Sequence, residues 1–146
     1  MRLFSLFLIL TLCSLGQAQA DASFSIFLTT KTQDGVPSNE PNSEFGCSDR
    51  IYAVIKANGL AKSQHLLEAI WRDPHGKDRE HTRYPFVVRH DQERIWVWLK
   101  LHRSSEAALV QFMNPSAGMD EFVGEWRIKV LVDGQLIDQK SFAVIC

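Results

Sequence analysis

Cysteine is scarce in this 146-residue chain, which contains three, and the sequence also lacks the short motifs of several enzyme classes. It has no Gly-x-Ser-x-Gly elbow of a serine hydrolase and no glycine-rich loop that would cradle a phosphate. The formal net charge of −1 provides no strong field to attract the whole protein to nucleic acid or to a membrane surface. These absences disfavour an enzyme and predict neither a cofactor nor a nucleic-acid partner.

Long hydrophobic runs are also missing, with one exception at the N-terminus. Residues 1–20 read MRLFSLFLILTLCSLGQAQA, an apolar stretch after one positive charge that ends in Ala18-Gln19-Ala20. This pattern is typical of a cleaved secretory signal, and the alternative is a buried N-terminal helix. Cys13 follows a leucine instead of the small residue of a lipoprotein signal, so we expect it to leave with residues 1–20. The prediction is a single exported domain, 21–146, periplasmic or secreted and without a membrane span.

Two cysteines remain in the predicted mature domain, Cys47 and Cys146. An even pair in an exported protein favours a disulfide, and the alternative is two free or intermolecular thiols. A bridge between them would close nearly the whole domain and fasten the last strand at its end.

Apolar alternation and turn signals predict seven strands and an all-β fold. The expected strands are 23–29, 49–57, 63–73, 81–90, 94–102, 125–132 and 135–146. Asp133-Gly134 predicts the turn of the closing hairpin, and Pro85 suits an edge strand or a bulge. Residues 31–46 are interpreted as a polar loop. A short helix is expected at Ala108–Met113, so the fold predicted is a two-sheet sandwich with one short helix before the last hairpin.

Several of these segments carry a resemblance to a known class of domain. Trp71 followed by Asp73-Pro74-His75-Gly76, then Gly124-Glu125-Trp126, Val132-Asp133-Gly134 and Phe142-Ala143-Val144, resemble immunoglobulin-like modules of bacterial exported proteins. The resemblance spans roughly residues 48–146 and concerns the fold. It implies a seven-stranded sandwich that binds, braces or spaces other molecules, and a topology that places Cys47 and Cys146 at the same pole.

The sequence contains residues that can bind metals, but their spacing does not match that of a known metal site. Cys146 is the last residue, and no His or Met follows Cys47 within fifteen residues, which disfavours a copper site. The chain has a basic central band, 72–103, that holds four of the five histidines: His75, His81, His90 and His102. Ordinary exposed histidines on solvated strands explain them better than a convergent metal site, which needs at least three inward-pointing ligands.

The aromatic residues are the most informative feature. If the alternating apolar residues of 94–102 face the core, then Trp96, Trp98 and Lys100 face outward. Neighbouring strands would add further residues to this outer face, and the candidate binding-surface residues are Phe27, Tyr52, Lys56, Trp96, Trp98 and Lys100. Such a patch is larger than a solvated sheet face normally carries. Three interpretations stay open: a cover formed by the predicted helix, a protein partner or second copy, and a platform for a glycan or other ligand.

From these observations we predict an exported, non-catalytic binding or accessory domain. Its expected partner is another envelope or secreted protein, or a second copy of itself, contacted through the aromatic sheet face. The alternative is a periplasmic carrier of a small ligand, a glycan or a metal.

Overall fold

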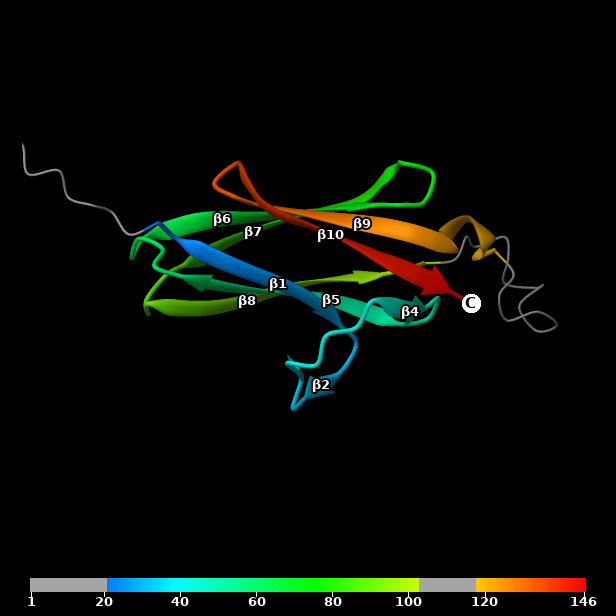
Figure 1. Ribbon diagram of the computed structural model, residues 1–146, viewed down its shortest axis with the longest axis horizontal. Coiled ribbons are helices and arrows are strands. Elements are labelled where there is room, and N and C mark those ends of the chain that lie inside the picture. The colour runs from blue at the N-terminus through cyan, green and yellow to red at the C-terminus, as the bar shows by residue number, and fades with distance from the viewer. Residues whose placement is uncertain (1–20, 103–117) are drawn as a thin grey trace, which may run out of the picture.

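The computed structural model describes residues 21–102 and 118–146, which fold almost entirely into strands (Figure 1). The all-β prediction is confirmed. The predicted signal segment 1–20 and the predicted helix Ala108–Met113 lie outside the described residues. The helical part of the described chain is one turn of 3-10 helix, η3 (Asp120–Phe122). Among the described residues, none forms a helix long and apolar enough to cross a bilayer.

One sheet has three antiparallel strands in the order β1-β5-β8. Their bounds are β1 (Ser23–Thr29), β5 (Arg50–Asn58) and β8 (Gln92–Lys100). Apolar and polar residues alternate along all three strands, which is why each strand buries one face. The register pairs Ile26 with Ile55 and Ile55 with Ile95, so the apolar side chains of the three strands meet on one side.

The second sheet has five strands in the order β4-β10-β9-β6-β7. Their bounds are β4 (Glu44–Gly46), β6 (Gln64–Arg72), β7 (Asp78–Val87), β9 (Gly124–Val132) and β10 (Gln135–Ile145). Asp133 and Gly134 form the β9–β10 turn with φ of 52° and 79°, as the Asp-Gly signal predicts. Pro85 lies on β7, an outer strand of this sheet, where its missing N–H costs no ladder hydrogen bond.

The prediction of a plain polar loop at 31–46 is wrong. This segment contains a small hairpin, β2 (Thr32–Gln33) and β3 (Val36–Pro37), followed by β4. Asp34 and Gly35 provide the hairpin turn, again with positive φ, so the Asp-Gly signal was present there too. Strand β4 pairs in parallel with β10, and the N-terminal part of the chain therefore crosses from one sheet to the other between β1 and β4.

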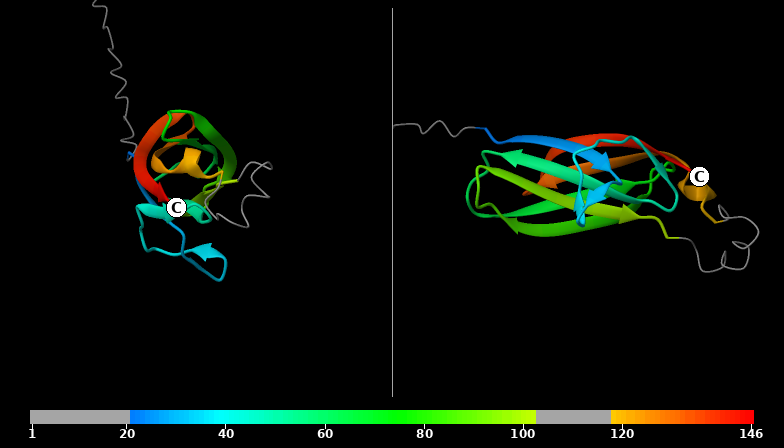
Figure 2. Two further views of the ribbon diagram at one scale, coloured as in Figure 1. Left: turned by 90° about the vertical axis from the view of Figure 1, so that its right-hand side faces the viewer. Right: turned by 90° about the horizontal axis from the view of Figure 1, so that it is seen from below.

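Both main sheets contribute to one hydrophobic core. Viewed along the long axis, the strands curve around this shared interior (Figure 2). Trp71 on β6 and Trp126 on β9 are fully buried, and both pack against Phe142 on β10, at ring-centroid distances of 5.9 and 6.1 Å. The Trp126 indole N–H donates to the carbonyl of Phe122 at 2.7 Å, which satisfies its buried polar atom.

Cys47 and Cys146 are joined by a disulfide with a Cα–Cα distance of 5.3 Å. The parallel β4–β10 register, which pairs Ile145 with Gly46, brings the next residue of each strand together at this position. The alternation of apolar residues back from Ile51 and along 142–146 predicts that both cysteines face inward, and this prediction is wrong for Cys146. Cys47 directly follows β4 and belongs to the core, whereas Cys146 is exposed beyond the end of β10.

Candidate binding groove

The predicted aromatic face exists on the outer side of the three-stranded sheet. The register aligns Phe27, Val54 and Trp96 in one row across the sheet, and Thr29, Tyr52 and Trp98 in the next. Val54 faces outward yet is fully buried, because aromatic side chains flank it on both sides. The remaining candidates, Lys56 and Lys100, lie on the same face, so the structure brings all six predicted binding-surface residues together.

Cations lie against the aromatic rings of this face. The guanidinium of Arg50 is 5.9 Å from the Trp98 ring centroid, and the Lys56 ammonium is 5.4 Å from that of Phe27. Such cation–π contacts hold the long side chains flat over the sheet. The face is therefore an aromatic surface with a positively charged border.

The β2–β3 hairpin covers one end of this face. Arg94, whose guanidinium is 5.8 Å from the Trp96 ring, donates from Nη2 to the carbonyl oxygens of Pro37 and Ser38 at 2.5 and 3.4 Å. Pro37 is buried and Trp96 is half-buried, whereas Trp98 is 54% exposed. Of the two tryptophans, Trp98 is thus the one available to a ligand. Whether the predicted helix also covers the face depends on residues outside the described part of the chain.

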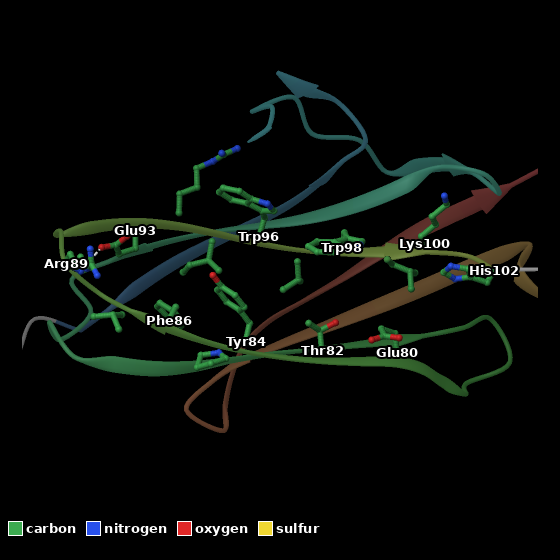
Figure 3. A pocket seen from close by; sticks show the side chains of 16 residues that line it. Glu80, Thr82, Tyr84, Phe86, Arg89, Glu93, Trp96, Trp98, Lys100 and His102 are labelled. Carbon is green, nitrogen blue, oxygen red and sulfur yellow. Dashed lines mark hydrogen bonds between the residues drawn. The ribbon is translucent and has the colours of Figure 1, made fainter. Parts of the chain in front are cut away.

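A groove of about 840 Å³ adjoins the aromatic face, between β7 and β8. Figure 3 shows Trp96, Trp98 and Lys100 on the β8 side, with Tyr84, Thr82 and Glu80 across from them on β7. The full lining is Glu80, Thr82, Tyr84, Pro85, Phe86, Val87, Arg89, Glu93, Arg94, Ile95, Trp96, Val97, Trp98, Leu99, Lys100 and His102. The sequence analysis identified the β8 wall but missed the β7 wall, because residues 80–84 form an uninterrupted polar run without alternation.

The groove exists because the two sheets differ in width. Leu67 and Trp71 of β6 are fully buried, and the register pairs them with Tyr84 and Glu80 of β7 on the same sheet face. On β7 that face is polar, and Tyr84 is 48% exposed. The core-facing side of the wider sheet therefore passes from buried at β6 to accessible at β7.

The charges of the groove are unevenly satisfied. Glu93 accepts hydrogen bonds from the backbone N–H groups of Arg89 and His90, which lower its pKa. Arg94 is engaged with the hairpin carbonyls. Among the described residues, the side chains of Arg89, Lys100 and Glu80 have no ion-pair partner. Within the described part of the chain, two cations and one carboxylate of the groove are thus without an ion-pair partner.

A second polar cluster, missed from the sequence, lies at the start of β6. His65 Nδ1 is 2.7 Å from Oδ2 of Asp133, and its Nε2 is 3.2 Å from the Ser63 hydroxyl. The spacing is that of a Ser-His-Asp triad. However, Nε2 also lies 2.8 Å from the carbonyl oxygen of Ala61, which can only accept a hydrogen bond. The Asp133 carboxylate at Nδ1 and the Ala61 carbonyl at Nε2 both accept hydrogen bonds, so they favour the doubly protonated ring and raise the pKa of His65. A doubly protonated imidazole cannot take a proton from a serine.

The four histidines of the central band are dispersed. His81 Nε2 lies 2.9 Å from Glu68, His90 Nδ1 lies 3.4 Å from Glu93, and His102 lines the groove. His75 is exposed in the β6–β7 turn. Within residues 21–102 and 118–146, no three His, Cys, Asp or Glu side chains gather as a metal site would need.

No family model matches the chain, and no curated protein matches it either. Among solved structures, it is similar to the alkylpurine DNA glycosylase AlkC of Pseudomonas fluorescens bound to DNA containing an abasic site analog. The TM-score is 0.51 at 12% identity, over 88% of this chain and 32% of that one. A β-glucosidase from Listeria innocua in complex with glucose has a TM-score of 0.46 at 7% identity, over 84% of this chain and 16% of that one.

A second β-glucosidase, involved in saponin metabolism in intestinal bacteria, has a TM-score of 0.44 at 13% identity, over 85% of this chain and 16% of that one. The chain therefore spans about a third of the glycosylase and about a sixth of each glucosidase. The likeness to the glycosylase concerns the fold alone, and the two weaker ones carry no functional argument.

Proposed function

We propose that the chain is an immunoglobulin-like two-sheet sandwich of the kind found in bacterial exported proteins. The strand order supports this assignment, because β1-β5-β8 and β10-β9-β6 follow the A-B-E and G-F-C orders of that fold. In this scheme β7 takes the place of strand C′, the extra strand beside C in variable-type domains. The seven strands of the proposed sandwich are then β1, β5, β6, β7, β8, β9 and β10, with β2, β3 and β4 as short additions.

The function that the geometry supports best is non-catalytic binding of another envelope or secreted protein. The observation that carries it is Trp98, a large aromatic side chain that is 54% exposed beside a groove and a row of further aromatics. Tryptophan, tyrosine and arginine dominate the binding energy of protein interfaces, and all three gather here. A self-association through the same face is the variant of this proposal in which the partner is a second copy.

Export is part of the proposal. It rests on the secretory pattern of residues 1–20 and on a disulfide that an oxidising compartment would preserve. N-terminal sequencing of protein recovered from outside the cytoplasm tests it, because cleavage after Ala20 would leave Asp21 as the first residue. Recovery of an intact Met1 terminus would contradict export by this signal.

A small-ligand carrier is the second candidate function. The groove volume of about 840 Å³ falls within the range of small-molecule sites, roughly 300 to 1,000 Å³. Tyr84 and Trp98 on opposite sides would offer apolar ring faces to a sugar or another flat ligand. A carrier would hold its ligand inside the groove, whereas a protein partner would also cover the aromatic face outside it. The two functions therefore differ in how much of this surface must be accessible.

Partner capture from native envelope extract tests the main proposal. We expect Trp98→Ser to abolish capture of any specific protein, and the double Trp96→Ser/Trp98→Ser variant to do the same. Leu136→Ser is the matched control, since Leu136 is also 54% exposed but lies at the β9–β10 hairpin. Each variant's urea unfolding midpoint establishes that it is folded. Equal capture by wild type and Trp98→Ser would contradict a binding role for this face.

A further inference from the structure

The three-stranded sheet is two strands narrower than the five-stranded sheet, and β8 ends it on the side of the groove. We propose that the groove receives one extended peptide strand of a partner protein, which adds to the open edge of β8. This inference rests on the proposed binding function and names the form of its partner. The added strand would lie over the accessible face of β7.

The middle of the β8 edge lacks the residues that normally protect an edge strand. Natural edge strands are normally blunted by charges, proline or bulges, because their free N–H and C=O groups pair with any available strand. Residues Ile95–Leu99 carry neither a charge nor a proline, and β8 pairs with β5 in unbroken register. Its other long side has no strand partner among the described residues. Such an edge is a template for strand addition.

The edge of β7 is protected by comparison. Pro85 has no N–H to offer to a new strand. Two of its outward side chains are also engaged, because His81 Nε2 lies 2.9 Å and Arg83 Nε 3.5 Å from the same Glu68 carboxylate. Of the two strands that border the groove, β8 is therefore the one that a peptide backbone can join.

The groove floor matches an alternating peptide. Every second side chain of an added strand would face β7, where Phe86 and Tyr84 provide an apolar contact and Thr82 and Glu80 a polar one. The other side chains would emerge beside Trp96 and Trp98 on the outer face. β8 has nine residues, so a nine-residue segment, about 30 Å at roughly 3.3 Å per residue, would occupy the full edge.

Charge complementarity specifies the ends of the peptide. Arg89 and Lys100, which have no ion-pair partner among the described residues, lie near opposite ends of β8, and Glu80 is the one carboxylate of the lining without a described partner. We therefore expect carboxylate side chains near both ends of the bound strand and apolar residues in its middle. The partner segment is thus extended, apolar at its centre and acidic at its ends.

Fluorescein-labelled nine-residue peptides of this pattern are the probe. They alternate apolar and polar residues, carry Asp or Glu at both ends, and are titrated against the full purified protein with its disulfide intact. We expect a subset to bind, and Lys100→Glu to weaken their binding at least tenfold, whereas Lys77→Glu changes it less than about twofold. Lys77 is the matched control, because it is exposed in the β6–β7 turn away from the groove.

Backbone N-methylation of a bound peptide distinguishes strand addition from other modes. Alternate N–H groups of an added strand point toward β8, so methylating one set should weaken binding at least tenfold and methylating the other should have little effect. Equal sensitivity of the two sets would overturn the inference. The inference would also be overturned if no peptide of this pattern binds. A third contrary result is that the wild type forms a dimer that excludes the peptides and that dissociates in Trp98→Ser.

The two experiments distinguish failure of strand addition from failure of the proposed binding function. Trp98→Ser tests capture of the whole partner, whereas N-methylation tests only the backbone pairing. If Trp98→Ser abolishes capture while no peptide binds, the aromatic face remains a binding surface and strand addition fails. If neither the partner nor a peptide depends on Trp98 or Lys100, both fail together.

Discussion

The imidazole of His65 is 2.7 Å from the carboxylate of Asp133, although the two residues are 68 positions apart in the chain. The other carboxylate oxygen of Asp133 accepts the backbone N–H of Leu66 at 2.9 Å. Asp133 lies in the β9–β10 turn and His65 near the start of β6, so this carboxylate fastens the turn to the neighbouring strand. The imidazole ring also packs at 5.6 Å from the ring of Phe86 on β7.

The free energy of unfolding should fall as the pH rises above neutrality. Hydrogen bonding to Asp133 and to the Ala61 carbonyl raises the pKa of His65, so folding favours the imidazolium. The resulting stabilisation is complete below the ordinary histidine pKa of about 6.5 and is lost as the pH rises through the higher folded value. Urea unfolding between about pH 5.5 and about pH 8.5 measures this loss.

Asp133→Asn is the matched control for that titration. Asparagine tolerates the left-handed conformation of residue 133, whose φ is 52°, but it carries no charge to hold the imidazolium. We expect the variant to be less stable by about 1–3 kcal/mol at pH 6, with a flatter pH dependence above it. A pH profile parallel to that of the wild type would show that His65 does not cause the dependence.

The β6–β7 turn should depend on one buried ion pair. The Asp73 side chain is fully buried and accepts hydrogen bonds from the N–H groups of His75 and Lys77 and, at 2.5 Å, from Arg79 Nε. Burial alone would raise the pKa of Asp73, but these donors outweigh it and lower the pKa. Arg79→Met should destabilise the protein by about 3 kcal/mol, because it leaves a buried charge without its partner.

Arg83→Met provides the comparison for that variant. Arg83 is 63% exposed in an ion pair with Glu68, so its removal should change the unfolding free energy by less than about 0.5 kcal/mol. Chemical denaturation of both variants beside the wild type measures the difference. Similar losses for Arg79→Met and Arg83→Met would contradict a special role for the Asp73 pair.

Two glycines should respond differently to alanine. Gly124 has φ of 133°, and a Cβ there would lie 3.0 Å from Pro74 Cγ, whereas a Cβ at Gly134 would meet nothing within 4 Å. Gly134→Ala should therefore cost about 1–2 kcal/mol through its positive φ alone. Gly124→Ala should cost about 2–4 kcal/mol, because it adds steric overlap to backbone strain. Thermal and urea unfolding rank the two, and a greater loss at Gly134 would refute the packing argument.

The disulfide should contribute strongly to stability. It joins residues 99 positions apart, and closing so long a loop restricts the unfolded chain. Cys47→Ser and Cys146→Ser should each lower the free energy of unfolding by about 2–5 kcal/mol. Alkylation of the denatured, unreduced protein should label neither thiol of 21–146. Labelling of both would contradict the bridge, and loss of a dimer on reduction would indicate that it is intermolecular.

Much of the fold was predictable because its signals are local. All seven predicted strands are present within a few residues of their expected bounds, since period-two alternation and the turns around Asp133 and Gly59 depend on neighbouring residues. The placement of Phe27, Tyr52 and Trp98 on one outer face follows from the same alternation. Strand β4 was missed because three residues beside a polar loop carry no periodicity of their own.

Other features depend on contacts between distant residues. Residues Glu44–Gly46 become a strand only because β10 offers its edge there, and the disulfide follows from that pairing. The cover over Trp96 depends on Arg94 reaching the carbonyl of Pro37, 57 residues away. The β7 wall of the groove depends on how far the wider sheet extends beyond β8.

The sequence by itself determined the all-β class, the strand positions and the outward side of the aromatic residues, because backbone alternation assigns each side chain to a face before any sheet forms. Only the tertiary structure decided which of those side chains stay accessible. Burial depends on what packs against a face, and here the β2–β3 hairpin covers the Trp96 end while the unequal sheet widths leave Trp98 and Tyr84 open to the groove.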